Sequence, residues 1–490
     1  MESHELTIAL EMEIASLDPL YGTAMQHDRN ILNLFYENLF YMSETGAFLP
    51  ALAERWEQSP DGLTISISLR PNVFFHNGEK LDAAAVKDSL ERSQRSNILT
   101  RSSVMLNALS HVEVKNELDL DIVLKRVDPT IMAALSSEAG MIVAPAISAQ
   151  PVPAHRAPIG TGPFLFEEWS GGLRVVALRN PDYWNLDEGE KSEGTISKIT
   201  VLFAPNATVK INGALAGEID LADNVQIRDH QRLKRSSMVR LQEAPTSVSY
   251  YVSLNNKRPP FDDARVRRAL AAAIDRTGVN TIVSRGRAVV NPTWVPAKSG
   301  AFNETLSPVS TDQSGAARNF TAQGIDRLRL TVIQREPDVL IAQVLQAQLG
   351  EVGVKLDIEV LERQSWLSKI LSGNYQLATL RTIVPRPDPD FNFSAYYARD
   401  ARANYSSIED NRIFDLVDLA RSTLSQNDRS AAYREIQKIL VGEAYQVFLI
   451  TQPNFDLMAS NLVGVEYEFG GAWRLGGARF LNTDLVGQAS

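Results

Sequence analysis

Short segments in which apolar and polar residues alternate recur along the chain and predict β-strands. Leu6–Ile14 (LTIALEMEI) and Leu63–Arg70 (LTISISLR) show this alternation, and Val248–Asn255 (VSYYVSLN) is a further predicted strand. Because successive side chains of a strand point to opposite faces, the alternation is typical of strands with one buried face. HVEVKN and LDLDIVLK are further strand candidates, and the apolar run in YQVFLIT predicts a buried strand.

Four segments instead carry apolar residues at helical spacing. Asn30–Met42 follows the first strand and its turn, and Asp82–Ser93 begins with an aspartate that predicts an N-cap. Phe261–Arg276 has the aspartate pair Asp262-Asp263 at its start, followed by strong helix formers, so we expect one helix that stops before Gly278. Ala431–Ile439 is the fourth. Strands and helices therefore mix along the whole chain.

One stretch in the second half of the chain orders strand, helix and strand. RLTVIQ, the helical segment Val339–Leu349 and VKLDIEVLE follow one another with short connections, which predicts an α/β unit. A Pro- and Gly-rich stretch between Pro145 and Gly172 predicts a loop or a crossing between domains. The pattern as a whole indicates an α/β protein.

Composition sets the size and the class of partner. With 490 residues, of which 44% are hydrophobic, the chain is too long for one core, and we expect two or three domains. Its net charge is −10 with the two signs interleaved, which disfavours nucleic acid or an anionic membrane as partner and favours a small molecule or a protein. No apolar run reaches the length of a membrane span. The start MESHELTIAL lacks a signal peptide, so the chain is either cytosolic or an exported form without its leader.

The common catalytic and metal motifs are missing from the sequence. It has no cysteine, no G-x-S-x-G elbow, no phosphate-binding loop and no H-E-x-x-H. Its six histidines are scattered over the N-terminal half without a pair at metal-binding spacing. We therefore expect no metal, no cofactor and no enzymatic activity, with a hydrolase as the alternative.

Several quoted segments together resemble one family, the extracytoplasmic solute-binding proteins of peptide, nickel and opine ABC importers. The matching segments follow one another in the family's order: LPALAERWEQSPDGLTISISLRPNVFFHNGEKLDAAAVKDSLER, GTGPFLFEEW, LRNPDYW, AGEIDLAD, YYVSLNNKRPPFDDARVRRALAAAIDR and PDPDFNF. The resemblance implies an α/β, two-lobed periplasmic binding protein of the Venus-flytrap type with mixed β-sheets and an extra subdomain in its N-lobe. It also implies a periplasmic monomer that delivers its solute to ABC permease subunits.

The resemblance further implies how the chain divides. We predict a discontinuous lobe 1 made of residues 1–44, 165–242 and 455–490. Residues 45–164 would form the extra subdomain, and residues 243–454 would form lobe 2.

A segment rich in proline and charge, RTIVPRPDPD, matches the place where the family's interlobe cleft binds ligand. Dipeptide-binding members hold the peptide's ammonium group with an aspartate for which this chain has Pro385. The same members bind the peptide's carboxylate with the arginine of a Q-R-P turn, and Arg335 of Gln334-Arg335-Glu336-Pro337 matches that arginine. The alternative is that Arg335 is an ordinary loop arginine.

Nickel-binding members supply the remaining candidates. Their R-T dipeptide matches Arg381-Thr382, and the arginine that they present to a chelator's carboxylates matches Arg101. Two of their aromatic positions are Ile383 and Pro387 here and no histidine follows His230, which disfavours nickel. The comparison also places further residues on cleft loops: Tyr21, Met25, His27, Ser136, Ser137 and Glu138.

Four candidate arginines without an obvious ammonium anchor favour a ligand with carboxylates and a substituted or missing α-amine. They are Arg101, Arg335, Arg381 and Arg386. An opine, an amino acid joined through its nitrogen to a keto acid or a sugar, fits this description and is one of the family's ligand classes. Three alternatives stay open: a short peptide whose ammonium group is held by Glu138 or Asp388, a cleft hydrolase that uses one of these carboxylates as a base, and a sensory co-receptor that docks on a membrane sensor.

Overall fold

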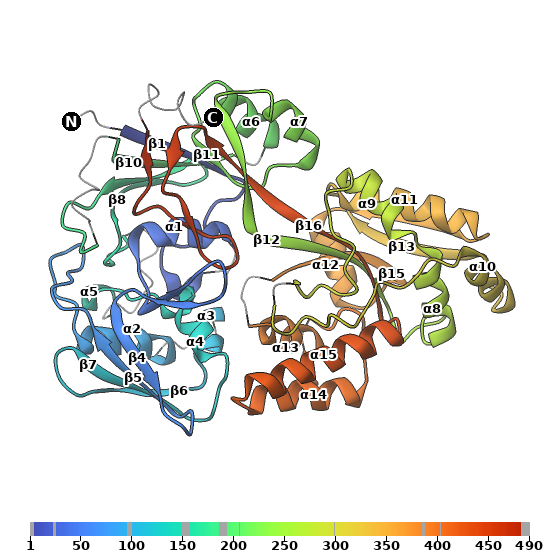
Figure 1. The fold of residues 1–490 in the computed structure, drawn as a ribbon, viewed down its shortest axis with the longest axis horizontal. Coiled ribbons are helices and arrows are strands. Elements are labelled where there is room, and N and C mark those ends of the chain that lie inside the picture. Colours follow the sequence, from blue (N-terminus) through green and yellow to red (C-terminus); the bar gives the residue numbers. More distant parts are fainter. Residues whose placement is uncertain are drawn as a thin grey trace. The chain divides into compact units, whose positions relative to one another are not determined.

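The computed structural model describes residues 4–22, 26–95, 100–148, 157–185, 194–204, 206–297, 299–384, 388–401 and 403–481. The chain forms two compact units (Figure 1). Unit 1 comprises Met1–Thr246 and Asn454–Ser490, and unit 2 comprises Ser247–Val384 and Asp388–Pro453. The chain passes from unit 1 to unit 2 within β12 (Val239–Leu254) and returns within β16 (Gln446–Ala459). The finer three-part division stays a prediction.

Unit 1 contains a mixed sheet built around β1 (His4–Leu10). This strand pairs in parallel with β10 (Ile196–Phe203) and with β11 (Leu221–Ala222). The sheet continues antiparallel from β10 to β9 (Arg174–Arg179) and on to β8 (Phe164–Ser170). The mixture of parallel and antiparallel pairs confirms the mixed sheets that we expected.

Unit 1 also contains a separate four-stranded antiparallel sheet. Its order is β4 (Ala53–Gln58), β5 (Thr64–Leu69), β7 (Asp119–Leu124) and β6 (Leu109–Val114). Buried and less buried side chains alternate along β5 and β7, as the sequence pattern predicts. The helix α2 (Ala83–Arg95) packs on β6, and Asp82 caps its start by accepting from the Ala85 amide at 2.8 Å. The sheet has a hydrophobic core of its own.

The remaining elements of unit 1 are short. The helices are η1 (Pro19–Tyr21), α1 (Gln26–Phe35), α3 (Arg101–Met105), α4 (Ile131–Leu135), η2 (Glu138–Gly140), α5 (Pro145–Ser148), α6 (Ala207–Leu215), η4 (Ile227–Asp229) and α7 (His230–Leu233). The strands are β2 (Phe40–Met42), β3 (Phe48–Pro50), β17 (Leu462–Val463), β18 (Glu466–Tyr467), β19 (Trp473–Arg474) and β20 (Arg479–Phe480).

The helix predicted over Asn30–Met42 is too long. Helix α1 ends at Phe35, and Phe40–Met42 forms the strand β2 instead. At the end of α1 the Phe35 carbonyl accepts from the Gly162 amide at 2.9 Å, so a distant segment takes a bond that the helix would otherwise use. A residue far along the chain therefore ends this helix.

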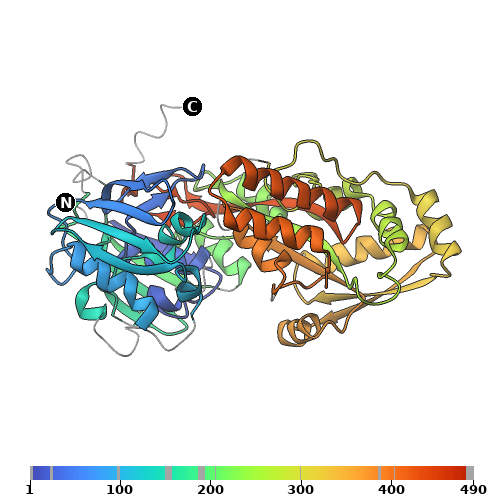
Figure 2. The ribbon, with the colours of Figure 1, turned by 90° about the horizontal axis from the view of Figure 1, so that it is seen from below.

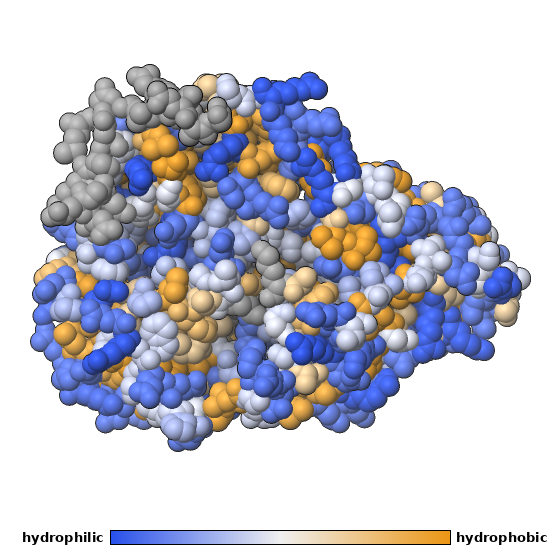
Figure 3. Space-filling model, viewed as in Figure 1, coloured by the Kyte–Doolittle hydropathy of each residue, from blue (hydrophilic) through white to orange (hydrophobic). Residues whose placement is uncertain are grey.

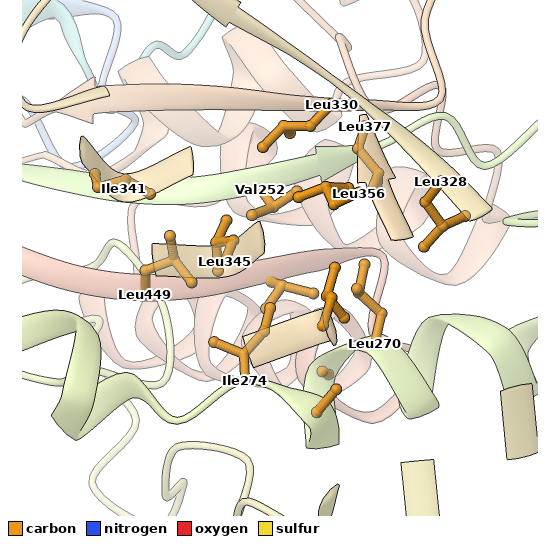
Figure 4. Packing of buried hydrophobic residues seen from close by; sticks show 14 of the residues in the cluster. Val252, Leu270, Ile274, Leu328, Leu330, Ile341, Leu345, Leu356, Leu377 and Leu449 are labelled. Carbon is orange, nitrogen blue, oxygen red and sulfur yellow. The ribbon is translucent and has the colours of Figure 1, made fainter. Parts of the chain in front are cut away.

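Unit 2 holds the predicted strand–helix–strand unit. Strands β13 (Arg327–Ile333) and β14 (Lys355–Leu361) pair in parallel and are joined through α11 (Asp338–Glu351). On its other side β13 pairs in parallel with β15 (Leu377–Ile383), which pairs antiparallel with β12. Leucine, isoleucine and valine side chains from these strands, α11 and α8 pack together as the main core of unit 2 (Figure 4).

The other helices of unit 2 are α8 (Ala264–Ala273), α9 (Arg276–Ser284), α10 (Gln313–Ala322), α12 (Arg363–Leu371), α13 (Asp390–Tyr397), α14 (Asn411–Ser422) and α15 (Gln426–Gly442). Helices α14 and α15 run side by side in both ribbon views (Figures 1 and 2).

The single helix predicted over Phe261–Arg276 is in fact interrupted. Helix α8 ends at Ala273, Asp275 caps α9, and Gly278 lies inside α9 rather than beyond a helix end. Arg276 is 5% exposed, and its guanidinium donates to the Ala271 and Ile274 carbonyls at 3.1 and 3.2 Å. This side chain thus satisfies carbonyls that are left without a helical donor at the break.

Candidate solute-binding site

Three candidate residues of unit 1 lie on elements that pack against one another. Tyr21 ends η1, Arg101 begins α3 and Glu138 begins η2, and each of these elements contacts the other two. The Ser102 hydroxyl donates to the Pro19 carbonyl at 3.1 Å, which ties α3 to η1. At Gly22 a Cβ atom would lie 3.2 Å from Cγ of Glu138, so the backbone after η1 runs close to that side chain. The structure therefore brings these three candidates together.

Buried polar contacts fix this region of unit 1. Asp18 caps η1 by accepting from the Leu20 amide at 3.1 Å, and it is fully buried. Arg92 donates to both Asp18 carboxylate oxygens, with one Nη1–Oδ1 distance of 2.8 Å, in the bidentate geometry that makes such pairs strong. Arg101 itself is exposed, and the Thr100 hydroxyl caps its helix in a reciprocal box with Ser103.

The hydroxyls of the two candidate serines already donate to nearby backbone carbonyls. Ser136 and Ser137 are both 1% exposed, and their hydroxyls donate to the Ala133 and Ala134 carbonyls at 3.1 and 2.7 Å. Their carbonyls accept from side chains of other segments: Arg29 and Asn38. These contacts hold the turn that positions Glu138, which is 2% exposed.

The remaining candidates of this group lie around α1. Nε2 of His27 is 3.1 Å from the neighbouring Asp28 carboxylate. The candidates Met25 and Arg386 lie outside the described residues.

In unit 2 the structure brings Arg335 and Arg381 to one edge of the sheet. Strands β13 and β15 are parallel with Leu330 opposite Leu377, so their carboxyl ends meet at the same edge. Arg381 lies near the end of β15, and Arg335 lies two residues beyond the end of β13. This is the edge where ligands commonly bind in α/β sheets.

Tyr250 lies near enough to both arginines to be affected by their charges. It stands opposite Arg381 across the β12–β15 pair and is 5% exposed. Burial raises the pKa of the Tyr250 phenol, whereas the positive charges of Arg381 and Arg335 act in the opposite direction. The phenol therefore stays neutral and carries its proton beside two cations.

Asp338 orients Arg335. Its Oδ2 accepts from Nε of Arg335 at 2.8 Å, and the carboxylate is fully buried at the first residue of α11. Among the described residues, Asp338 is the carboxylate partner of Arg335, whose side chain is 31% exposed. Oδ1 of Asp338 has no hydrogen-bond partner among these residues. An anionic side chain at a helix N-terminus is favourable, so Asp338 is held by the helix as well as by the arginine.

Asp388 is committed within unit 2. Its Oδ1 accepts from the Asp390 amide at 2.9 Å and from Nη2 of Arg429 at 2.7 Å. The Arg429 side chain is 4% exposed, so this is a largely buried ion pair. The negative charge of Asp388 is thus already balanced by a cation.

Sequence reasoning missed Tyr250 and Asp338. Asp338 carried a local signal, because an aspartate three residues after an arginine at a helix start is placed to pair with it. Tyr250 carried none, since its relation to Arg381 arises from the pairing of two strands that are more than a hundred residues apart in the chain.

Two properties bear on the kind of site. Over the described ranges, no three histidine, cysteine, aspartate or glutamate side chains gather in a way that would hold a metal ion. Within the same residues, no helix has the length and apolar character needed to cross a membrane.

The fold and these groups define a two-domain solute-binding protein, and comparison with known proteins assigns the family. Residues 47–404 match the model of the bacterial extracellular solute-binding proteins, family 5. This match covers more than half of the chain, so the chain belongs to that family, as its sequence resemblance implied.

Relatives and solved structures agree with this assignment. A probable di/tripeptide-binding protein of Pseudomonas aeruginosa is 24% identical over 86% of this chain and 85% of its own. The dipeptide-binding protein of Pseudoalteromonas sp. SM9913, solved with Met-Leu, superposes with a TM-score of 0.82 at 21% identity, over 98% of this chain and all of that one. The binding protein AgaA of A. tumefaciens R10, solved with agropinic acid, has a TM-score of 0.78 at 22% identity, over 98% and 99% of the two chains. These likenesses confirm the predicted fold class.

Proposed function

We propose that this chain is the receptor of an ABC importer for a small carboxylate-bearing solute, with an opine-like amino-acid conjugate as the leading candidate. Members of its family are extracytoplasmic binding proteins, which fits capture outside the cell membrane. In this proposal the protein is a non-enzymatic monomer that hands its solute to permease subunits.

One observation carries the proposal: two arginines and a neutral phenol meet at one sheet edge of unit 2. The guanidinium of Arg335 is turned by Asp338, and Arg381 lies against Tyr250. A guanidinium presents a planar fork of N–H donors that matches a carboxylate, and a phenol adds one more donor. The N-terminus of α11 favours an anion at the same place.

Two largely buried carboxylates of unit 2 are already paired with arginines, which favours an opine over a free amino terminus. Asp338 is fully buried and paired with Arg335, and Asp388 is paired with Arg429. Neither carboxylate offers an uncompensated charge to a ligand's ammonium group. A solute whose α-amine is substituted needs no such partner.

A second candidate, a short peptide, is supported by a different observation. Relatives along most of the chain are named as di- and tripeptide-binding proteins. In unit 1, Glu138 lies with Tyr21 and Arg101 on mutually packed elements, and its carboxylate is the group that we propose for an ammonium ion.

A thermal-shift screen of the purified protein tests both candidates. Opines, sugar–amino-acid conjugates, dipeptides, tripeptides and nickel chelates would be added separately, and hits would be measured by calorimetry. We expect an acidic conjugate to raise Tm, and Arg335→Ala and Arg381→Ala to lower affinity by roughly 30-fold or more, because each removes a charge-assisted contact.

The matched control is Arg318→Ala, which removes an exposed arginine from α10 of the same unit. It should leave affinity unchanged. Tight binding of ordinary dipeptides with no response to opines would reject the opine assignment. Unchanged affinity in both site variants would reject the arginine pair as the carboxylate site.

A further inference from the structure

A dense group of cations lies on unit 1 at helix α7. Arg228, Arg232, Lys234 and Arg235 fall within eight residues, and all four are exposed. We call these four residues the α7 patch. In the space-filling view the surface over α6 and α7 is mainly hydrophilic (Figure 3). The net charge of −10 and the interleaved signs disfavour an anionic membrane as partner for the chain as a whole, and the α7 patch is a local exception, because four of eight consecutive residues are cationic.

The cations of the α7 patch are weakly neutralised. Nε of Arg228 lies 3.7 Å from the neighbouring Asp229 carboxylate, and Arg232 donates to a neutral amide oxygen, Oδ1 of Asn212, at 2.9 Å. Within the part of the chain that the structure describes, Lys234 and Arg235 form no ion pair. Most of the positive charge is therefore available to an anionic partner.

Two exposed apolar side chains flank these cations. Met238 follows the patch in the chain and is 55% exposed, and Val209 on α6 is 56% exposed. A Cβ atom at Gly217, just beyond the end of α6, would lie 3.9 Å from Cε of Met238, so this methionine reaches the α6 corner. Long cationic side chains beside exposed apolar ones are typical of surfaces that rest on a lipid headgroup layer.

We propose that the α7 patch is a docking surface for anionic phospholipid headgroups. Lipid phosphates accept from guanidinium and ammonium groups without requiring a fixed arrangement, which suits four cations spread over η4, α7 and the residues that follow α7. An acidic protein partner would share the charge complementarity but gives no reason for the exposed methionine and valine. The inference goes beyond solute capture and does not depend on which solute is bound.

Co-sedimentation of the whole protein with vesicles tests this surface. The probe is a mixture of phosphatidylglycerol and phosphatidylethanolamine, with pure phosphatidylcholine, a zwitterionic lipid, as the comparison without net charge. We expect binding to the anionic vesicles at low salt only, because added salt screens exposed charges over about a Debye length.

The variant pair is well matched. The double variant K234E/R235E reverses two adjacent cations of the patch, and K125E/R126E reverses an adjacent Lys–Arg pair elsewhere on unit 1, where both residues are also exposed. The two proteins have the same net charge. We expect the patch variant to lose vesicle affinity by about 30-fold and the control variant to retain most of it.

Three outcomes would overturn the inference. The first is no binding of the wild-type protein to the anionic vesicles, and the second is an equal loss in both variants, which would indicate net charge alone. The third is that pure lipid fails while a membrane protein crosslinks to the wild type but not to K234E/R235E, which would indicate an acidic protein partner. Tm of each variant checks that the fold is intact.

Discussion

Asp338 is the residue on which the geometry of the candidate site depends most directly. It is fully buried at the start of α11 and accepts from Nε of Arg335. This contact occupies Nε of the guanidinium. In the proposed site the two Nη groups are therefore left to donate to a ligand, and Asp338 is a positioning residue that acts through Arg335.

Replacing Asp338 by asparagine tests this role. The variant keeps the shape and one acceptor but loses the charge, and we expect the Kd of a carboxylate-bearing solute to rise about fivefold, because hydrogen bonds between charged groups are stronger than neutral ones. Calorimetry on wild type, Asp338→Asn, Arg335→Ala and the double variant measures the coupling. In the Arg335→Ala background Asp338→Asn should have no further effect on Kd. A full fivefold loss there would contradict a role through Arg335.

Asp456 is a second buried carboxyl group with a testable signature. It lies on β16 and accepts from Nε1 of Trp473 at 2.8 Å and from the Tyr467 hydroxyl at 2.9 Å. Burial raises the pKa of Asp456 to about 7. The folded protein therefore binds this proton more tightly than the unfolded chain does.

This raised pKa predicts how stability depends on pH. The contribution of Asp456 is fully present below the ordinary aspartate pKa of 3.8 and is lost as pH rises through about 7. We expect the wild type to lose stability relative to Asp456→Asn over that window, by on the order of 3 kcal/mol. Urea unfolding at a series of pH values measures the difference.

Asp410→Asn provides a comparison of opposite sign. The paired Arg412 guanidinium lowers the pKa of Asp410, so its contribution is present above the ordinary value and is lost as pH falls. The free energy of unfolding of the wild-type protein, relative to that of Asp410→Asn, should therefore increase as pH rises. If the stability of the wild type relative to Asp456→Asn also rose with pH, the raised pKa of Asp456 would be refuted.

At the scale of elements, the turn at Gly162 packs tightly against the end of helix α1. The backbone at Gly162 passes so close to α1 that a Cβ atom there would lie 2.6 Å from the Phe35 carbonyl carbon and 2.7 Å from the Leu34 oxygen. Both neighbours are backbone atoms and cannot move aside cheaply. The segment GTGPF thus packs against the end of α1 and leaves no room for a side chain at Gly162.

Gly162→Ala should consequently destabilise the protein by more than about 2 kcal/mol. Gly350→Ala is the matched control, because Gly350 lies in α11 with open space where a Cβ atom would lie, and alanine is the better helix former. The control should stabilise by about 0.5–1 kcal/mol. Urea unfolding of the three proteins tests both signs at once, and equal stability of Gly162→Ala and wild type would contradict the close contact.

At the scale of the whole molecule, solute binding should raise stability by mass action. At a concentration of 100 times Kd the gain is about 2.7 kcal/mol, which corresponds to a rise in Tm of roughly 5–10 °C for domains of this size. Scanning calorimetry with and without solute measures it. In Arg335→Ala the rise should fall to about a third at the same concentration, because a loss of affinity of roughly 30-fold leaves the solute at about 3 times Kd, and an equal rise in that variant would place the solute elsewhere.

The local pattern of the sequence determined much of the element order. The apolar and polar pattern predicted the strands now seen as β5, β6, β7 and the buried half of β12, and the strand–helix–strand unit around α11 is confirmed. These elements depend on residues near each other in the chain, so local periodicity suffices. The family's residues, read in order, also indicated the fold class.

The tertiary structure decided the features that join distant residues. Helix α1 ends where the Gly162 amide reaches it, α8 breaks where the Arg276 side chain takes two carbonyls, and Tyr250 meets Arg381 through strand pairing. The sequence by itself, through its resemblance to the family, determined that the chain is a two-lobed α/β solute-binding protein, whereas the binding of a carboxylate by its arginines stays a proposal. Only the structure decided which carboxylates are already paired, because a charge is neutralised by whichever partner lies nearest in space, and local spacing does not encode that distance.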